Sequence, residues 1–200
     1  MRHSFKFPQE IRTAVRAHVR SAIARVPVER FAQEPHYTTA LIAVLQGTAY
    51  SGPLGRVEFI STAANDRGSG SAESWSGVDF AITAQVSDGI TTIDKVIFFQ
   101  AKSAGRFDTV KLDEQIRSMK KFTRAPKVIE VPSVRRRIPE PVVYSGNRFL
   151  LRSVRSRMML SDYIVARVLT TLDGDTRPKV VTAAQSSSLE QLKIIAQMQS

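Results

Sequence analysis

Three polar side chains close an otherwise apolar pair of strands predicted within residues 77–103. Asp79 lies near the start of the first strand, and Gln100 and Lys102 end the second. A Ser-Asp-Gly turn signal near the midpoint folds the strands back on each other, which places Asp79 opposite the end of the second strand. Because Gln100 and Lys102 are two apart on a strand, they share one face, while Ala101 turns to the other. The pattern therefore predicts a carboxylate, an amide and an ammonium group at one point.

These residue types suit phosphodiester chemistry around a divalent cation. The Asp79 carboxylate is a hard oxygen ligand of the kind that Mg²⁺ prefers, and the Gln100 amide oxygen offers a similar ligand with one less negative charge. The carbonyl of Ala101 is a third candidate ligand. Lys102 is suited to orient or deprotonate a metal-bound water, or to hold a phosphate oxygen during in-line attack.

A purely structural interpretation of the same residues is the alternative. Asp79 would then be a turn or strand-start residue, and Lys102 an ordinary charge at a strand end. Gln100 is harder to explain in this way, because burying an amide without partners is costly.

The net charge of +11 is concentrated in one segment. Residues 101–160 carry 15 basic and 5 acidic side chains, whereas residues 1–100 carry 10 and 9. Such a concentration is typical of a polyanion-binding surface and predicts a nucleic acid as partner. A solvated basic face that aids solubility is the alternative. The candidate nucleic-acid contacts are Lys111, Lys120, Lys121, Arg135, Arg136 and Arg137.

The composition limits the class of protein. A chain of 200 residues with 42% hydrophobic content is enough for one globular domain with a sizeable core. The absence of cysteine excludes disulfides, thiolate zinc sites and a cysteine nucleophile, and the three histidines are too scattered to predict a histidine-based metal site. The sequence shows neither a signal-peptide core nor a run of membrane-helix length, so we expect a soluble cytoplasmic protein without a membrane partner.

Periodicity predicts the elements that position these residues. The spacing of apolar residues predicts helices over residues 8–26, 34–47, 108–122, 160–172 and 188–198. Besides the pair within residues 77–103, strands are predicted over residues 54–62, 128–131, 142–144 and 148–154. A row of arginines on the first helix is expected to be solvated. The order predicts an α/β (α+β) domain in which helices flank a central mixed β-sheet.

The residues Asp79 and Gln100-Ala101-Lys102, about twenty positions apart on successive strands, resemble the D…(E/Q)xK motif of the PD-(D/E)xK, restriction-endonuclease-like nucleases. The similarity is to the variant in which glutamine replaces the usual glutamate. It covers about residues 34–150, where the predicted order of elements is similar to the core of that family. The remaining residues would be helical extensions of a single domain comprising residues 1–200.

This resemblance implies a Mg²⁺-dependent or Mn²⁺-dependent endonuclease that acts on DNA. It implies Asp79, Gln100 and the Ala101 carbonyl as metal ligands, with Lys102 at the attacking water. It also implies Glu34 as the acidic residue that some members add from the core helix. Secondary candidates are Glu73, from the loop before Asp79, and Gln115, from the helix after Lys102. By analogy alone, such a nuclease fits a role in defence against foreign DNA.

Two other functions stay open at this point. The glutamine lowers the negative charge of the site, and some proteins of this fold have lost catalysis, so a non-catalytic nucleic-acid-binding module is one alternative. The other is an interaction subunit or homo-oligomer in which the predicted C-terminal helix makes the contact.

Overall fold

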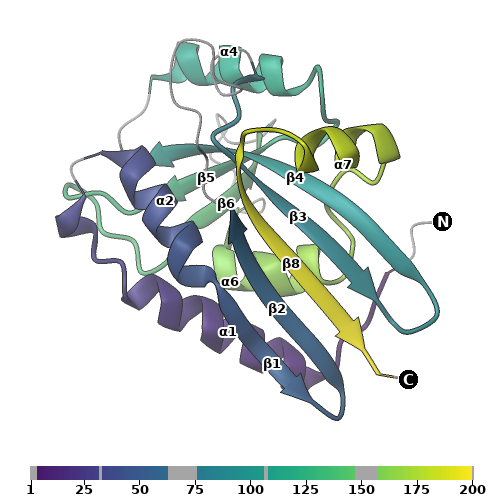
Figure 1. The fold of residues 1–200 in the computed structure, drawn as a ribbon. Helices are drawn as coiled ribbons and strands as arrows, with labels where there is room; N and C mark the ends of the chain where they lie inside the picture. Colours follow the sequence, from purple (N-terminus) through teal and green to yellow (C-terminus); the bar gives the residue numbers. More distant parts are fainter. Residues whose placement is uncertain (1–3, 32, 63–75, 106–107, 147–156, 200) are drawn as a thin grey trace.

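The computed structural model describes residues 4–31, 33–62, 76–105, 108–146 and 157–199. Over these residues the chain is an α/β protein with an eight-stranded mixed sheet and five α-helices (Figure 1). The strand order in the sheet is β1-β2-β8-β3-β4-β5-β6-β7. The strands are β1 (Gly47–Gly52), β2 (Gly55–Thr62), β3 (Phe80–Ser87), β4 (Thr92–Ser103), β5 (Lys127–Val131), β6 (Val142–Ser145), β7 (Arg157–Met159) and β8 (Glu190–Met198).

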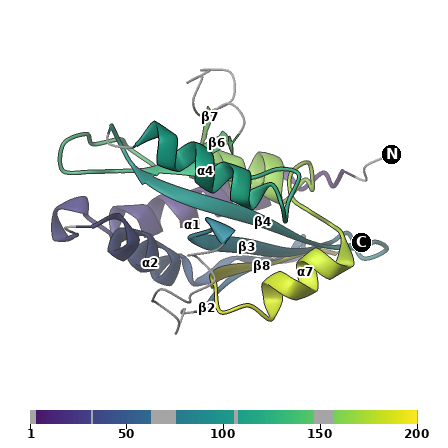
Figure 2. The same cartoon turned by 90° about the horizontal axis from the view of Figure 1, so that it is seen from above.

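Helices cover both faces of the sheet. They are α1 (Gln9–Ala24), α2 (Glu34–Leu45), α4 (Thr109–Met119), α6 (Leu160–Tyr163) and α7 (Pro178–Gln185), with a 3₁₀ turn at Val28–Arg30 and a π-helical turn at Ile164–Val168. Figures 1 and 2 show α1 and α2 side by side and away from α7. On β4, Phe99 and Ala101 belong to the core cluster that includes α1, α2 and α6. Their neighbour Phe98 packs instead with Met119 of α4 and Val181 of α7, so alternate residues of β4 face different helices.

Most predicted elements are confirmed with small changes at their ends. These are α1, α2, β2, the β3–β4 pair, α4, β5 and β6. The strand β1 and the helix α7 were not predicted, because β1 is rich in glycine and polar residues and α7 spans only eight residues. The predicted helix over residues 160–172 is α-helical only at its start and continues as the π-helical turn. The predicted strand over residues 148–154 lies outside the described residues.

The prediction of a C-terminal helix is wrong. Residues Glu190–Met198 form β8, which pairs antiparallel with β2 and parallel with β3 inside the sheet (Figure 1). Leu192, Ile194 and Ala196 are buried at alternate positions of this strand. The same apolar residues also fit helical spacing, and pairing with strands distant in sequence decides between the two. A homo-oligomer contact through a C-terminal helix is therefore not possible, because these residues form a strand inside the sheet.

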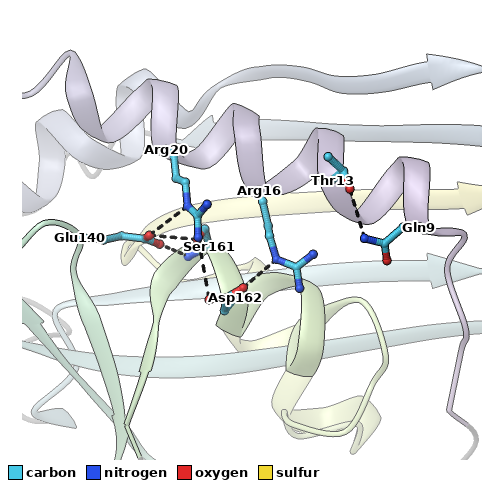
Figure 3. Close-up of polar contacts among 7 residues, drawn as sticks. All are labelled: Gln9, Thr13, Arg16, Arg20, Glu140, Ser161 and Asp162. Atoms are coloured by element: carbon cyan, nitrogen blue, oxygen red, sulfur yellow. Dashed lines mark hydrogen bonds and ion pairs between the residues drawn. The ribbon is translucent and has the colours of Figure 1, made fainter.

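Two arginines of the row on α1 are paired rather than simply solvated. Arg16 Nε donates to Asp162 Oδ1 of α6 at 2.7 Å, and Arg20 Nε lies 3.5 Å from Glu140 Oε2 (Figure 3). Glu140, which is 3% exposed, also accepts hydrogen bonds from the backbone N and the hydroxyl of Ser161 at the start of α6. The expectation of a solvated row is thus correct only in part, because these contacts tie α1 to α6.

No helix within the described ranges is long and apolar enough to cross a membrane.

Lys95 of β4 is a buried lysine on the face of the sheet that carries the π-helical turn. It is 1% exposed, and its ammonium donates to the carbonyls of Arg167, at 3.2 Å, and Asp173, at 2.8 Å. Burial lowers the pKa of Lys95 to about 7, although the charge of Asp173 acts in the opposite direction. An unfolded lysine keeps a pKa near 10.4, so between these values the unfolded chain binds more protons than the folded one. The contribution of Lys95 to stability therefore rises as the pH rises from about 7 toward 10.

We predict that Lys95→Met abolishes this contribution. Between pH 7 and pH 9.5, the free energy of unfolding of the wild type should gain on the order of 2–3 kcal/mol that the variant does not gain. Urea unfolding at the two pH values measures the difference. Lys111→Met, at an exposed lysine of α4, is the control and should keep the wild-type pH dependence. An unchanged pH dependence in Lys95→Met would contradict the prediction.

Candidate active site at the ends of β3 and β4

The Asp79 carboxylate lies where β3 begins and β4 continues past it. Phe80, the first residue of β3, pairs with Phe99, and Asp79 N donates to Phe99 O at 2.9 Å. Asp79 Oδ2 accepts a hydrogen bond from Ala101 N at 2.6 Å and another from the side-chain Nε2 of Gln100. The predicted opposition of Asp79 and Gln100 is confirmed.

The extra length of β4 explains this contact. Residues 100–103 pair in parallel with β5 but extend beyond the first residue of β3. The Ala101 N–H on the β3 side therefore has no strand carbonyl to bond, and a buried amide without an acceptor is costly. The Asp79 side chain supplies the acceptor that a longer β3 would have supplied.

Gly77 allows α4 to approach this point closely. Its φ of +69° lies in the left-handed region, and a Cβ there would lie 2.8 Å from the backbone oxygen of Gln115 on α4. Ser76 supports the same turn, because its hydroxyl accepts a hydrogen bond from Val78 N at 3.1 Å. The residues before Asp79 thus bring the backbone of α4 against the end of the hairpin, and the predicted role of the Gln115 side chain stays a prediction.

Two amide oxygens are buried here without donors. Gln100 is 2% exposed, and its Nε2 also lies 3.3 Å from Ala101 O, but its Oε1 has no hydrogen-bond partner. Gln115 Oε1 is likewise buried and unpaired. Leaving a buried acceptor unsatisfied costs about 1–3 kcal/mol. A cation or a hydrogen-bond donor that reached either oxygen would remove this cost.

Lys102 is half-buried and follows Gln100 on the same face of β4. In the register with β5 it pairs with Glu130, a buried acid that the sequence analysis did not single out. Glu130 accepts hydrogen bonds from Tyr144 Oη at 2.9 Å and from Gly105 N at 3.3 Å. The pKa of Tyr144 is raised, first by burial and then by this bond to Glu130. The only sequence signal for Glu130 was an isolated acid within an apolar strand.

Glu34 lies on the other side of the sheet from Gln100 and Lys102. It is half-buried at the start of α2 and lines a cavity with Ser103, whose side chain shares the face of Ala101. No hydrogen bond or ion pair joins the Glu34 and Asp79 side chains in the described structure. Glu73 lies outside the described residues. The catalytic roles given to both residues stay predictions.

The described residues contain no group of three histidine, cysteine, aspartate or glutamate side chains that could hold a metal. A cation at this site would therefore rely on one carboxylate and on neutral oxygens. Among the described residues, the oxygens that the structure brings together here are those of the Asp79 carboxylate, the Gln100 amide and the Ala101 carbonyl.

The predicted nucleic-acid contacts are all exposed, but they differ in their partners. Lys111, Lys120 and Lys121 are on or next to α4, and Arg135, Arg136 and Arg137 are in the loop between β5 and β6. Arg137 pairs with Glu29, and Arg136 Nη1 lies 4.0 Å from Glu130 Oε1. Arg135 lines the same cavity as Glu34.

Comparisons of the chain with models of protein families, with curated proteins and with solved structures gave no match.

We predict that the close approach at Gly77 makes Gly77→Ala more destabilising than Gly105→Ala. Gly105 has a similar φ of +74°, but a Cβ there would meet only the Arg136 side chain, at 3.5 Å. The left-handed backbone should cost about 1–2 kcal/mol in both variants. The contact with the backbone of α4 should add about 1–3 kcal/mol for Gly77→Ala alone. Chemical denaturation of both variants measures the difference, and equal losses would contradict the proposed packing.

Proposed function

We propose that this protein is a divalent-metal-dependent nuclease that hydrolyses phosphodiester bonds in DNA, built on a restriction-endonuclease-like PD-(D/E)xK core. The observation that carries the proposal is the contact of Asp79 with Gln100 and Ala101, beside a buried Gln100 Oε1 without a donor. Supporting it, α2, β2, the β3–β4 hairpin with this motif, α4 and the parallel strand β5 follow one another along the chain in the predicted order, although β8 lies between β2 and β3 in the sheet.

The oxygens at the site fit Mg²⁺ or Mn²⁺, because they are hard donors and one of them is charged. Asp79, Gln100 and the Ala101 carbonyl would hold the ion. An amide offers either its NH₂ group or its oxygen to a neighbour, so Gln100 is suited to hold Asp79 in the metal-free protein and a cation in the loaded one. When bound, the metal would polarise the phosphodiester and make its water more acidic.

Lys102 would act on the phosphate or on the attacking water. Its ammonium is on the face of Gln100 and has no ion pair among the described residues, so its charge is available to substrate. Lys102 is part of β4 and pairs with Glu130 of β5, so its backbone is held by the sheet rather than by a loop. In this role it would stabilise the negative charge that develops during attack.

The basic residues would hold the DNA backbone. The loop that carries Arg135 follows β5, and the chain leaves β4 beside it, because Ala104 N donates to Val131 O at 2.8 Å. The carboxyl ends of two parallel strands thus meet at this edge, where ligands commonly bind in α/β sheets. Contacts of this kind to phosphate give salt-sensitive binding with little dependence on sequence.

A non-catalytic nucleic-acid-binding module is the second candidate. Two observations favour it: the described residues contain no three-acid cluster, and Asp79 already has donors from Gln100 and Ala101. In that case the same contacts would serve only to close the end of the hairpin.

We predict that the protein cuts plasmid or single-stranded DNA with Mg²⁺ or Mn²⁺ and not with a chelator. Asp79→Asn and Lys102→Met should each lower the cleavage rate about 100-fold or more, because each removes a group that acts on the transition state. Asp94→Asn removes the same charge near the other end of β4 and should cut like the wild type. Binding without cutting under every metal condition would support the module instead.

A second prediction concerns Gln100→Glu. Without metal, the variant should unfold at a lower temperature than the wild type, because it loses the donor to Asp79 and adds a like charge beside it. Mg²⁺ should then raise its melting temperature by more than it raises that of the wild type, since binding to the folded state alone stabilises it. Thermal unfolding with increasing Mg²⁺ measures both effects. A destabilised variant that does not respond to Mg²⁺ would show that no cation binds between residues 79 and 100.

A further inference from the structure

A cavity of about 290 Å³ lies between the end of α4 and the first turns of α7. Its wall includes Val78, Phe98 and Leu189, none of which is more than 9% exposed, together with Phe122 and Val180 from the two helical segments. Close packing leaves few gaps of this size in a protein, so a gap with an apolar wall is a candidate ligand site. We call it the α4–α7 cavity.

Arg177, the residue before α7, holds one side of the cavity in place. Its Nη2 donates to Phe122 O at 2.8 Å, which ties the segment after α4 to the start of α7. The same guanidinium donates to both carboxylate oxygens of Asp175, at 2.9 and 2.6 Å. The charge of Arg177 is therefore used within the protein.

Two lysines at the same cavity keep their charge for a ligand. Lys121, just after α4, and Lys179, in the first turn of α7, line the cavity and are exposed. Neither ammonium has a hydrogen bond or an ion pair within the part of the chain that the structure describes. No acidic side chain is among the described residues that line the cavity. The α4–α7 cavity therefore combines an apolar wall with a positive edge.

The other polar groups of the wall are already bonded. The Ser76 hydroxyl accepts from Val78 N at 3.1 Å, and the Ser187 hydroxyl donates to Ala184 O at 2.6 Å. A polar ring such as a nucleobase would leave its own donors and acceptors without partners against such a wall, which is costly. The wall suits a hydrocarbon, and the two lysines suit an anionic group that stays at the edge.

The size limits the hydrocarbon. A volume of about 290 Å³ is at the lower end of the roughly 300–1,000 Å³ of ligand pockets, so it suits one short chain rather than the two chains of a membrane lipid.

We propose that the α4–α7 cavity binds a small amphiphilic anion, a carboxylate with a single short hydrocarbon chain. The chain would pack against Phe98 and Leu189, and the carboxylate would lie at Lys121 and Lys179. The inference does not depend on the proposed nuclease activity.

Calorimetric titration of the full chain with octanoate at low ionic strength tests the inference. Octanoate should bind at one saturable site, and its affinity should exceed that of butanoate by about fourfold for each added methylene, the usual gain from burying one CH₂ group. Octan-1-ol, which has the same chain without a charge, should bind about twofold to tenfold more weakly, as expected for one or two exposed ion pairs. Octylammonium should bind more weakly still.

Two exposed positions separate the contributions of charge and chain. Lys179→Met should reduce the preference for octanoate over octan-1-ol, whereas Lys111→Met, at an exposed lysine of α4 outside the cavity, should keep it. Ala183→Leu places a larger side chain in the cavity and should weaken octanoate binding about tenfold or more. Ala17→Leu, at an exposed alanine of α1, should bind octanoate like the wild type.

The absence of saturable octanoate binding, or equal binding of octanoate, octan-1-ol and octylammonium, would overturn the inference. So would an octanoate affinity that Ala183→Leu leaves unchanged. A second copy of the chain is the other candidate occupant. Sedimentation that shows a dimer of the wild type, lost in Ala183→Leu and insensitive to octanoate, would assign the cavity to that copy instead.

Discussion

One backbone amide constrains the candidate site more than any other group. β4 runs past the start of β3, and the N–H of Ala101 would be left without an acceptor if Asp79 did not bond to it. That requirement fixes a carboxylate at the end of the hairpin whatever the protein does. The same carboxylate oxygen then holds Gln100, whose amide is buried by the helices around it. The need to pair the Ala101 N–H has therefore brought a carboxylate and an amide together at the end of the hairpin, and both groups are possible metal ligands.

The surroundings of Asp79 depend on close packing rather than on further polar contacts. Gly77 brings the backbone of α4 to within contact distance, and the side-chain oxygens of Gln115 and Gln100 are both buried without a partner. On the other side of β4, the parallel pairing with β5 places the loop with Arg135 at the same edge. β8, inserted between β2 and β3, makes β3 an interior strand and so holds the whole edge in position.

The sequence predicted the hairpin and the opposition of Asp79 and Gln100 because both depend on local signals, namely period-two alternation and a Ser-Asp-Gly turn. It mispredicted β8, since the apolar residues of Glu190–Met198 fit a helix equally well and pairing with β2 and β3 decides. It did not predict that Lys95 is buried, because the carbonyls that accept hydrogen bonds from its ammonium belong to residues more than seventy positions away. Roles that arise from the meeting of distant segments, such as the cavity between α2 and the loop after β5, lie beyond any local pattern.

At the end of β4, the two faces of the strand carry different polar groups. Gln100 and Lys102 face α4, where charge and unpaired oxygens suit a metal and a phosphate. Ser103, the next residue, lines the cavity between α2 and the loop after β5, together with the charged residues Glu34 and Arg135. Because Ser103 and Gln100 point to opposite faces of β4, the sheet itself lies between Glu34 and the unpaired oxygen of Gln100, so a cation held by Asp79 and Gln100 would have to be bound without Glu34.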